Sequence, residues 1–423
     1  MKRYDSYKDS GVKWLGEIPS HWEMRKMKFS FDERSDKGYP SLPLLAATQN
    51  HGVIKKEDYE NRTVEATKSL DTLKKVEKGD FVISLRSFQG GIELCYCRGI
   101  ISPAYTILRP THIKGCYFKY LGKSPIFIQL LKSMVTGIRE GQNIDYAKLR
   151  DNQLPIPSLK EQEAIANYLD AATSKIDEAI AQQQKMIDLL NERKQIIINN
   201  AVTKGLDPNV KMKTSGIEWL GDIPEHWEFV KIKRYCTIKT GRTPSTSKEY
   251  YFEEGDINWF TPGDLNKFKL LKSERKVTQR AKREQACSIF PKNTVYLVGI
   301  GGTIGKVGFC ENEASCNQQI NAITPRPDKI FHRYLSYFIQ ATQIQIMRQA
   351  NLSTLPIINQ DRTGALFITV PPINEQIKIV STIEHNCEPI NEAIKVSEDR
   401  ITLLQERKQI IINDVVTGKV KVV

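Results

Sequence analysis

Hydrophobic residues recur at alternating intervals of four and three residues along two long segments of the chain, Glu161–Thr203 and Glu375–Thr417. The two segments align with each other without a gap. A heptad spacing of this kind lines up apolar side chains along one side of a helix, as a seam that a second such helix can cover. We therefore predict two long helices that pair as a coiled coil. The apolar seam residues are Leu169, Ile176, Ile180, Ile187, Leu190, Ile197, Ile383, Ile390, Ile394, Ile401, Leu404 and Ile411.

Prolines precede each predicted helix, and a glutamate, Glu161 or Glu375, lies in its first turn, where the helix dipole favours a negative charge. The alternative is two separate amphipathic helices, each packed on its own domain. A strict heptad spacing over at least six turns favours the paired helices.

Two motifs of the sequence are duplicated, one outside the predicted helices and one within them. Ser10–Glu23 (SGVKWLGEIPSHWE) returns as Ser215–Glu228 (SGIEWLGDIPEHWE), and Glu192–Asn199 (ERKQIIIN) returns unchanged as Glu406–Asn413. Such a frame predicts a pseudo-twofold fold with antiparallel helices. One copy of this opening segment starts the chain, and the other follows the first helix. We therefore expect a circularly arranged internal repeat, in which the end of the second helix lies next to the start of the chain and the termini are adjacent.

The segments between the repeats read as mixed α/β (α+β) domains. Strand-like runs such as Asp80–Leu85, Ile100–Leu108 and Asn293–Val298 alternate with glycine-rich turns. We predict four parts in chain order: a first variable domain, 1–153, with the opening segment 10–23; a first helix, 154–214; a second variable domain, 215–369, with the opening segment 215–228; and a second helix, 370–423.

The positive charge is concentrated in the variable segments. The chain carries a net charge of +13, of which residues 24–151 contribute +8 and residues 229–367 contribute +10, while the remainder carries −5. A polyanion that contacts both variable segments would explain this division, because basic residues that neutralise phosphates release counterions. Charge that serves only solubility is the alternative, but it has no reason to avoid the repeated frame.

Other functional classes find little support. No apolar run is long enough for a membrane span or a signal peptide, so the cytoplasm is the expected location. The eight cysteines form no CxxC pair, and we interpret Cys95 and Cys97 as buried or half-buried thiols and expect no metal site. The six histidines form no metal-binding pattern, and His21 and His226 are interpreted as structural.

The glycine cluster Gly299–Lys306 (GIGGTIGK) does not fit a phosphate-binding loop. A Walker loop needs glycine where Ile300 stands and serine or threonine where Val307 stands. Two interpretations of this turn stay open: its residues contact DNA, or it is a simple tight hairpin. No base-methylation, nuclease or helicase motif is found, so we expect no catalytic residue.

Several motifs together resemble the specificity subunit of type I DNA restriction-modification systems, over nearly the whole chain. They are the WLG(E/D)IPxHWE segments, the two helices closed by ERKQIIIN, and, in the variable domains, KGDFVIS (Lys78–Ser84), GIISPAY (Gly99–Tyr105), GRTPSTS (Gly241–Ser247), INWFTPGDL (Ile257–Leu265), GGTIGK (Gly301–Lys306) and NQQINAI (Asn317–Ile323).

The resemblance implies a function without catalysis in this chain. Two target-recognition domains would each bind one half of a bipartite, asymmetric site on double-stranded DNA, and the helices would set the gap. The helices would also dock methylase subunits, two by expectation, and through them the restriction subunits. S-adenosylmethionine, ATP and Mg²⁺ would belong to those partners, with no cofactor in this chain.

The glycine-rich turns and their neighbours are the candidate DNA contacts, since arginine and glutamine can distinguish bases while lysine and threonine more often bind the backbone. The candidates are Arg86, Ser87, Gly90, Gly91, Thr261, Gly263, Gly302, Thr303, Lys306 and Gln318. A structural role in the turn is the alternative for each. At the level of the whole protein, the alternatives are an autonomous DNA-modifying enzyme and a structural or regulatory protein that binds DNA without sequence preference.

Overall fold

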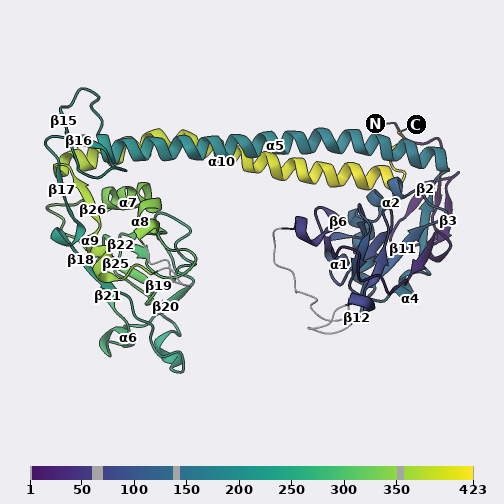
Figure 1. Ribbon diagram of the computed structural model, residues 1–423, viewed down its shortest axis with the longest axis horizontal. Coiled ribbons are helices and arrows are strands. Elements are labelled where there is room, and N and C mark those ends of the chain that lie inside the picture. Colours follow the sequence, from purple (N-terminus) through teal and green to yellow (C-terminus); the bar gives the residue numbers. More distant parts are fainter. Residues whose placement is uncertain (1, 60–69, 137–142, 350–356, 423) are drawn as a thin grey trace. The chain divides into compact units, whose positions relative to one another are not determined.

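The computed structural model describes residues 2–59, 70–136, 143–349 and 357–422 (Figure 1). The chain forms two compact units. Unit 1 comprises Met1–Gln184 and Glu398–Val423, and unit 2 comprises Lys185–Ser397.

Two long helices, α5 (Leu159–Lys204) and α10 (Ile373–Val416), contribute to both units. The beginning of α5 and the end of α10 belong to unit 1, and the remaining parts belong to unit 2. The sequence-based boundaries treated the helices as parts of their own, whereas the structure divides each helix between the two units.

Unit 1 is built on a four-stranded antiparallel sheet with the strand order β4-β11-β8-β9. Its strands are β4 (Phe31–Arg34), β8 (Phe81–Ile83), β9 (Glu93–Leu94) and β11 (Thr106–Pro110). Successive residues of a strand point to opposite faces. Phe81 and Ile83 accordingly belong to the core that includes the helices, whereas Val82 belongs to a second core. The sheet is therefore buried on both faces.

The other strands of unit 1 pair in two-stranded sheets, β1 with β2, β3 with β14, β5 with β6, β7 with β10 and β12 with β13. Their bounds are β1 (Tyr7–Asp9), β2 (Glu17–Pro19), β3 (Glu23–Lys26), β5 (Leu45–Thr48), β6 (Gly52–Lys55), β7 (Lys74–Val76), β10 (Gly99–Ile101), β12 (Val135–Thr136), β13 (Asn143–Ile144) and β14 (Gln153–Ile156). The short helices are α1 (Ser87–Gly90), α2 (Gly115–Leu121), α3 (Pro125–Ser133) and α4 (Tyr146–Leu149), with 3-10 turns η1 (Met27–Phe29), η2 (Lys56–Asp58) and η3 (Leu70–Thr72).

One strand prediction in unit 1 is wrong in extent. Ile100–Leu108 was interpreted as a single strand-like run, but it is divided between β10 and β11. A turn closed by the Tyr105 N–H, which donates to the Ser102 carbonyl at 3.2 Å, separates the two strands. After this turn the two strands belong to different sheets, β10 to the pair with β7 and β11 to the central four-stranded sheet.

Unit 2 repeats the central sheet with the order β18-β25-β22-β23. Its strands are β18 (Cys236–Thr240), β22 (Thr294–Val298), β23 (Val307–Cys310) and β25 (Ile320–Pro325). Val295 and Leu297 face the core that includes the helices, and Tyr296 and Val298 face a second core. Both units thus use the same two-sided sheet.

Unit 2 also contains a second four-stranded sheet, of order β20-β19-β24-β21, in which β19 and β24 run parallel. In unit 1 the corresponding parallel contact is a single bridge between Leu44 and Ile100. The remaining strands of unit 2 are β15 (Met212–Thr214), β16 (Asp222–Pro224), β17 (Glu228–Lys231), β19 (Ile257–Phe260), β20 (Arg275–Val277), β21 (Ile289–Phe290), β24 (Ala314–Cys316) and β26 (Phe367–Val370). Its helices are α6 (Gln279–Arg283), α7 (His332–Ala341), α8 (Gln343–Gln349) and α9 (Gln360–Ala365), with 3-10 turns η4 (Ile232–Arg234) and η5 (Glu249–Tyr251).

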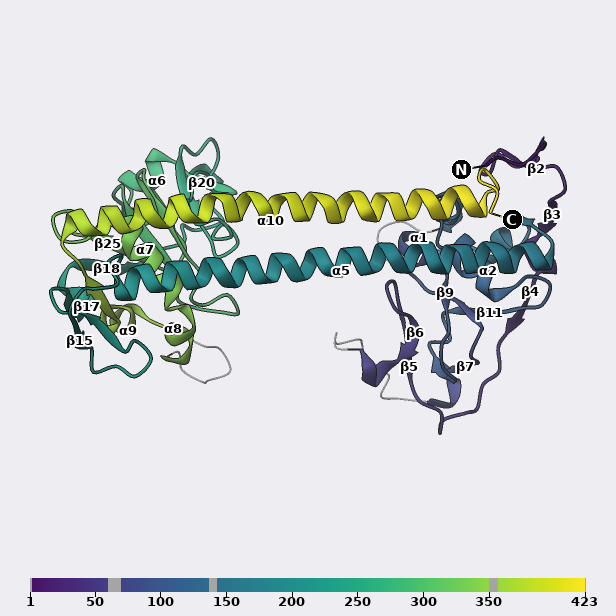
Figure 2. The same ribbon diagram turned by 90° about the horizontal axis from the view of Figure 1, so that it is seen from above.

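Within each unit the beginning of one long helix lies beside the end of the other, so the helices run antiparallel (Figure 1 and Figure 2). In unit 1 the Lys408 Nζ lies 2.6 and 2.7 Å from the two carboxylate oxygens of Asp177. In unit 2 the Lys194 Nζ donates to the Asn391 Oδ1 at 2.7 Å. All the apolar seam residues are buried or half-buried. The predicted fold class, α/β domains with a coiled coil of two long helices, is confirmed.

The second long helix contains a proline, Pro389, inside α10, which the heptad spacing over Glu375–Thr417 does not account for. Proline cannot donate the usual bond to the carbonyl four residues earlier, here that of His385. Pro389 and His385 are both exposed. Because water can reach the freed carbonyl on this outer side, the helix continues through the proline.

Side chains of the repeated opening segments form hydrogen bonds with the first turns of the long helices. In unit 1 the Glu161 carboxylate accepts hydrogen bonds from the Tyr4 hydroxyl at 2.8 Å and the Trp22 Nε1 at 3.0 Å. In unit 2 the Glu375 carboxylate accepts one from the Trp227 Nε1 at 3.1 Å. The Nε2 atoms of His21 and His226 lie 3.0 and 2.8 Å from the other oxygens of these carboxylates, which is the structural role predicted for both histidines.

Buried tyrosines join each unit to the end of a long helix. The Tyr117 hydroxyl lies 3.1 Å from the Val416 carbonyl in the last turn of α10. The Tyr334 hydroxyl lies 3.2 Å from the Val202 carbonyl in the last turns of α5. The same junction is therefore built twice, and each time it joins the beginning of one helix copy to the end of the other.

The termini are adjacent, as predicted, because the Lys421 N–H donates to the Lys2 carbonyl at 2.9 Å. Within the described ranges, no helix has the length and apolar character that would be needed to cross a membrane.

Candidate nucleic-acid interface

Four loops of unit 2 meet at one edge of its two four-stranded sheets. They are residues 241–243, 261–266, 299–306 and 317–319, which we call the rim of unit 2. Backbone bonds connect them: the Gly299 N–H donates to the Gln319 carbonyl at 2.8 Å, and the Asn317 N–H donates to the Phe260 carbonyl at 2.9 Å. The rim is thus a built surface of the sheets.

Thr261 and Gly263 form a rigid turn in this rim. The backbone N–H and the Oγ1 of Thr261 both donate to the Asp264 Oδ2, at 2.8 and 2.7 Å. The Gly263 carbonyl accepts from the Asn266 Nδ2 at 2.6 Å. The Thr261 hydroxyl therefore serves the turn, whereas Gly263 is exposed.

The turn between β22 and β23 presents Gly302 and Thr303, which are both exposed. A Cβ added to Gly302 would meet no atom within 4 Å, so the backbone there is open to a ligand. The Lys306 Nζ donates to the Asn266 Oδ1 at 2.8 Å, which ties this turn to the Thr261 turn. Gln318 is exposed and accepts a short hydrogen bond from the Thr243 hydroxyl. The structure brings all the unit 2 candidates into one rim: Thr261, Gly263, Gly302, Thr303, Lys306 and Gln318.

Three loops of unit 1 follow β5, β8 and β10 at the corresponding edge. They are residues 48–51, 84–91 and 102–105, the rim of unit 1, and they line a concavity of about 1010 Å³. Its exposed polar residues include Gln49, Asn50, Arg86 and Gln89. Both units therefore place loops of the same topological origin at the same edge.

The unit 1 candidates have unequal positions in this rim. Arg86 is exposed, and Gly90 packs against the side chain of Gln49. Ser87 is 2% exposed, and its Oγ accepts from the Ser84 N–H at 2.8 Å. Gly91 is buried with φ +88°, and a side chain there would collide with the Gly122 carbonyl. Ser87 and Gly91 thus shape the turn, while Arg86 is presented to a ligand.

Sequence reasoning missed Gln49, Asn50 and His51 in unit 1, and Arg242 and Asn266 in unit 2. The available signal in unit 1 was the short apolar run Leu44–Ala47 before these polar residues, which corresponds to INWF before the Thr261 turn. The run is too short to be identified by its own periodicity.

Glu93 of β9 also lines the unit 1 concavity. Its side chain is 3% exposed and lies 2.7 Å from the Lys123 Nζ. Burial raises the pKa of Glu93 to about 7, against the opposing effect of Lys123. At the corresponding position of β23, opposite Tyr296 as Glu93 is opposite Val82, unit 2 has Gly308.

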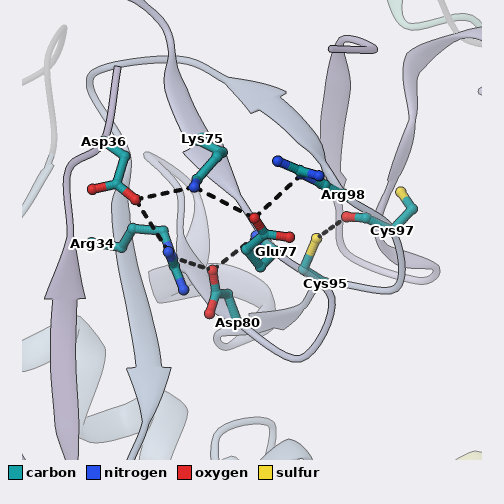
Figure 3. Close-up of polar contacts among 8 residues, drawn as sticks. All are labelled: Arg34, Asp36, Lys75, Glu77, Asp80, Cys95, Cys97 and Arg98. Carbon is teal, nitrogen blue, oxygen red and sulfur yellow. Dashed lines mark hydrogen bonds and ion pairs between the residues drawn. The ribbon is translucent and has the colours of Figure 1, made fainter. Parts of the chain in front are cut away.

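Figure 3 shows an ion cluster that joins β4, β7 and the residues before β8 in unit 1. Its members are Arg34, Asp36, Lys75, Glu77, Asp80 and Arg98. The Arg34 Nε donates to the Oδ2 of the nearly buried Asp80 at 2.8 Å. The hydrogen bond from Arg34 also lowers the pKa of Asp36. Because Asp80 immediately precedes β8, the cluster orients the strand that leads into the Arg86 turn.

Cys95 and Cys97 lie beside this cluster as free thiols (Figure 3). The Cys95 Sγ donates to the Cys97 carbonyl at 2.9 Å, and burial raises the pKa of Cys95 to about 12. The prediction of buried or half-buried thiols is confirmed.

The two rims offer guanidinium, amide, hydroxyl and ammonium groups beside open glycine backbone. Such groups suit base edges and phosphate oxygens. In the part of the chain that the structure describes, no three histidine, cysteine or acidic side chains gather as metal ligands would.

Known proteins with a similar sequence or a similar fold come from type I restriction-modification systems. The model of the type I restriction modification DNA specificity domain matches residues 224–401. A putative type I restriction enzyme MjaX specificity subunit from Methanocaldococcus jannaschii is 23% identical over 465 aligned residues, which cover 98% of this chain and 98% of the relative. The MjaIX specificity subunit of the same organism is 33% identical over 172 residues, which are 39% of each chain. A solved chain from the type I R-M system, described for its complex assembly and conformational transition, covers 95% of this chain and 99% of its own length with a TM-score of 0.70 and 14% identity, a likeness of fold.

Proposed function

Since the chain belongs to the family of type I restriction-modification DNA specificity subunits, we propose that its two units bind the two halves of a bipartite, asymmetric DNA site. The observation that carries this proposal is the pair of matched rims. The loops of each rim follow corresponding strands of the two units, yet the exposed side chains differ, Arg86 and Gln49 in one unit and Thr303 and Gln318 in the other. Equal scaffolds with unequal exposed groups suit two different half-sites.

The residues of each rim divide into two kinds of contact. The Arg86 guanidinium and the Gln318 amide have the donors and acceptors to distinguish base edges in the major groove. The Thr303 hydroxyl, the Lys306 ammonium and the open backbone at Gly302 suit phosphate oxygens, which fix register without reading sequence. Thr261 and Ser87 act through the shape of their turns.

The long helices would set the gap between the half-sites. The 46 residues of α5 correspond to roughly 70 Å at about 1.5 Å per residue. Seven residues inserted into each long helix, after Lys185 and after Asp399, would preserve the heptad spacing. We expect a longer gap between unchanged half-sites, and an unchanged gap would refute the role as a spacer.

Exposed residues that are repeated in the two helices support two equivalent partners. The seam explains why buried positions are repeated, but five exposed positions of this stretch are also identical in the two copies. They are Leu189, Glu192, Arg193, Gln195 and Ile196 in unit 2, and Leu403, Glu406, Arg407, Gln409 and Ile410 in unit 1. Leu403 is 63% and Ile410 60% exposed, so solubility would favour polar residues there. We assign each stripe to one methylase subunit, with the restriction subunits bound through the methylases.

A matched pair of variants tests the stoichiometry. L189D/I196D and L403D/I410D should each leave complexes with one methylase subunit, and the combined variant should bind none, as native mass spectrometry would measure. Two methylases retained in either variant would contradict the assignment.

The central experiment is co-expression with the methylase subunit and genome-wide mapping of methylated adenines. We expect one bipartite motif with two different halves and a fixed gap. S-adenosylmethionine, ATP and Mg²⁺ belong to the partner subunits in this proposal, so the purified chain should neither methylate nor cut DNA. Activity of the chain alone would favour an autonomous enzyme, and equal binding to matched and scrambled duplexes would favour a structural protein.

A further inference from the structure

Unit 2 carries a basic projection beside its rim, formed by residues 272–285 with β20 and α6. Beneath it lies a separate small core, in which Val277 and Ala281 of the projection pack against Tyr251, Ile257 and Trp259. β20 is an edge strand of its sheet and pairs only with β19, with Arg275 opposite Trp259. The projection is therefore a folded element with a fixed surface.

The charge of the projection is strongly positive. Residues 272–285 contain six cations and two carboxylates. Arg280 and Lys282 are paired, with Glu284 at 2.7 Å and Glu313 at 2.5 Å. In contrast, Lys272, Lys276 and Arg283 are exposed, and no carboxylate pairs with them among the described residues. These three cations are therefore available to an external anion.

Arg275 extends the same surface in a fixed orientation. Its guanidinium lies 4.2 Å from the ring centroid of Phe252 and 5.8 Å from that of Trp259. A guanidinium that stacks on an aromatic ring keeps its N–H edges free for a bidentate contact with phosphate.

The projection is continuous with the rim through Arg242. The Arg242 Nη1 donates to the Gln285 carbonyl directly after α6, at 3.2 Å. The Arg242 carbonyl accepts from the Trp259 Nε1 at 3.2 Å, and the Arg242 N–H donates to the Cys316 carbonyl at 2.9 Å. A ligand that lies on the rim therefore has the projection beside it.

We propose that this projection binds the phosphate backbone of duplex DNA next to the half-site that unit 2 contacts. The inference rests on the proposed function and deepens it. Lys272, Lys276 and Arg283 neutralise phosphates without reading bases, so they add affinity that depends on salt but not on sequence.

The test uses the full chain with its methylase and a fluorescent duplex that carries the mapped site. In K272A/K276A/R283A, the slope of log Kd against log salt concentration should fall in magnitude by about 2 to 3, since each lost phosphate contact removes about 0.9. The methylated motif should stay the same. Lengthening the duplex on one side of the second half-site should strengthen binding by the wild type more than by the variant.

K329A/K378A/K395A is the matched control, because it removes the same charge from exposed lysines of unit 2 outside the projection. A slope equal to that of the wild type, or a fall no larger than in this control, overturns the proposal. A changed half-site would make these residues base readers, and loss of bound methylase at an unchanged slope would assign the surface to a protein, so both also overturn it. A wild type without sequence preference would instead refute the proposed function.

Discussion

Unit 1 and unit 2 are alike where the long helices meet the domains and unlike at the far side of the central sheet. Both junctions use a glutamate that binds a tryptophan, and a buried tyrosine that binds the last turns of a helix. Beyond the central sheet, unit 1 has two-stranded sheets and an ion cluster, whereas unit 2 has a four-stranded mixed sheet and α6. The fold thus separates parts that must stay equal for symmetry from parts that are free to differ for recognition.

Exchange of one variable segment should have the largest effect. Replacing Met24–Gln153 by the segment of another family member should change one half-site completely and leave the other half and the gap unchanged. The rim of unit 1 is built within this segment, whereas that of unit 2 is not. Methylation mapping measures the result, and a change in both halves would mean that the units do not read independently.

Removal of the junction tryptophans should destabilise the two units equally. Trp22 is 0% and Trp227 is 1% exposed. Trp22→Ala and Trp227→Ala should each cost about 3–5 kcal/mol, because a large buried side chain is replaced by a cavity. Hydrogen exchange followed by mass spectrometry should show the loss of protection in unit 1 for the first variant and in unit 2 for the second.

The junction glutamates should show a smaller and unequal effect. The Glu161 side chain is 9% exposed and also binds Tyr4, whereas the Glu375 side chain is 27% exposed. Glu161→Gln should cost about 1.5–3 kcal/mol, typical of buried hydrogen bonds to a charged group, and Glu375→Gln should cost less. The same exchange experiment measures both, and equal costs would show that Tyr4 and burial add nothing.

The smallest predicted difference is an opposite dependence of the two units on pH. Burial lowers the pKa of His332 in unit 2 to about 4, despite the nearby Glu311, so the unfolded chain takes up this proton first as pH falls below about 6.5. Unit 2 should therefore lose stability as pH falls from 6.5 to 4. The raised pKa of Glu93, about 7, acts in the opposite sense, and unit 1 should lose stability as pH rises from 4.5 through 7.

Hydrogen exchange at pH 5 and pH 6.5, corrected for intrinsic rates, would compare the units directly. Glu93→Gln should remove the trend in unit 1 alone, and His332→Gln should remove it in unit 2 alone. Trends of the same sign in both units would contradict the prediction.

The helices, their seam, the adjacent termini and the family could all be predicted from sequence, because periodicity and repetition are local or copied features. The rims were predicted only in part. Whether Ser87 faces solvent or an internal turn, and whether Thr261 is free or bound to Asp264, depends on contacts that spacing does not encode. Gln49 and Arg242 were missed because their place in the rims comes from strand pairing between distant segments.

The division of each long helix between the units has a consequence for biosynthesis. Unit 2 is one continuous stretch, 185–397, so it can fold while translation of the chain is still in progress. The core of unit 1 needs Ile411, Val415 and Val416, and Tyr117 finds its partner 299 positions later. Unit 1, whose first part leaves the ribosome first, is thus completed last. A stop codon near residue 398 would remove the end of α10 and would prevent this N-terminal domain from completing its core.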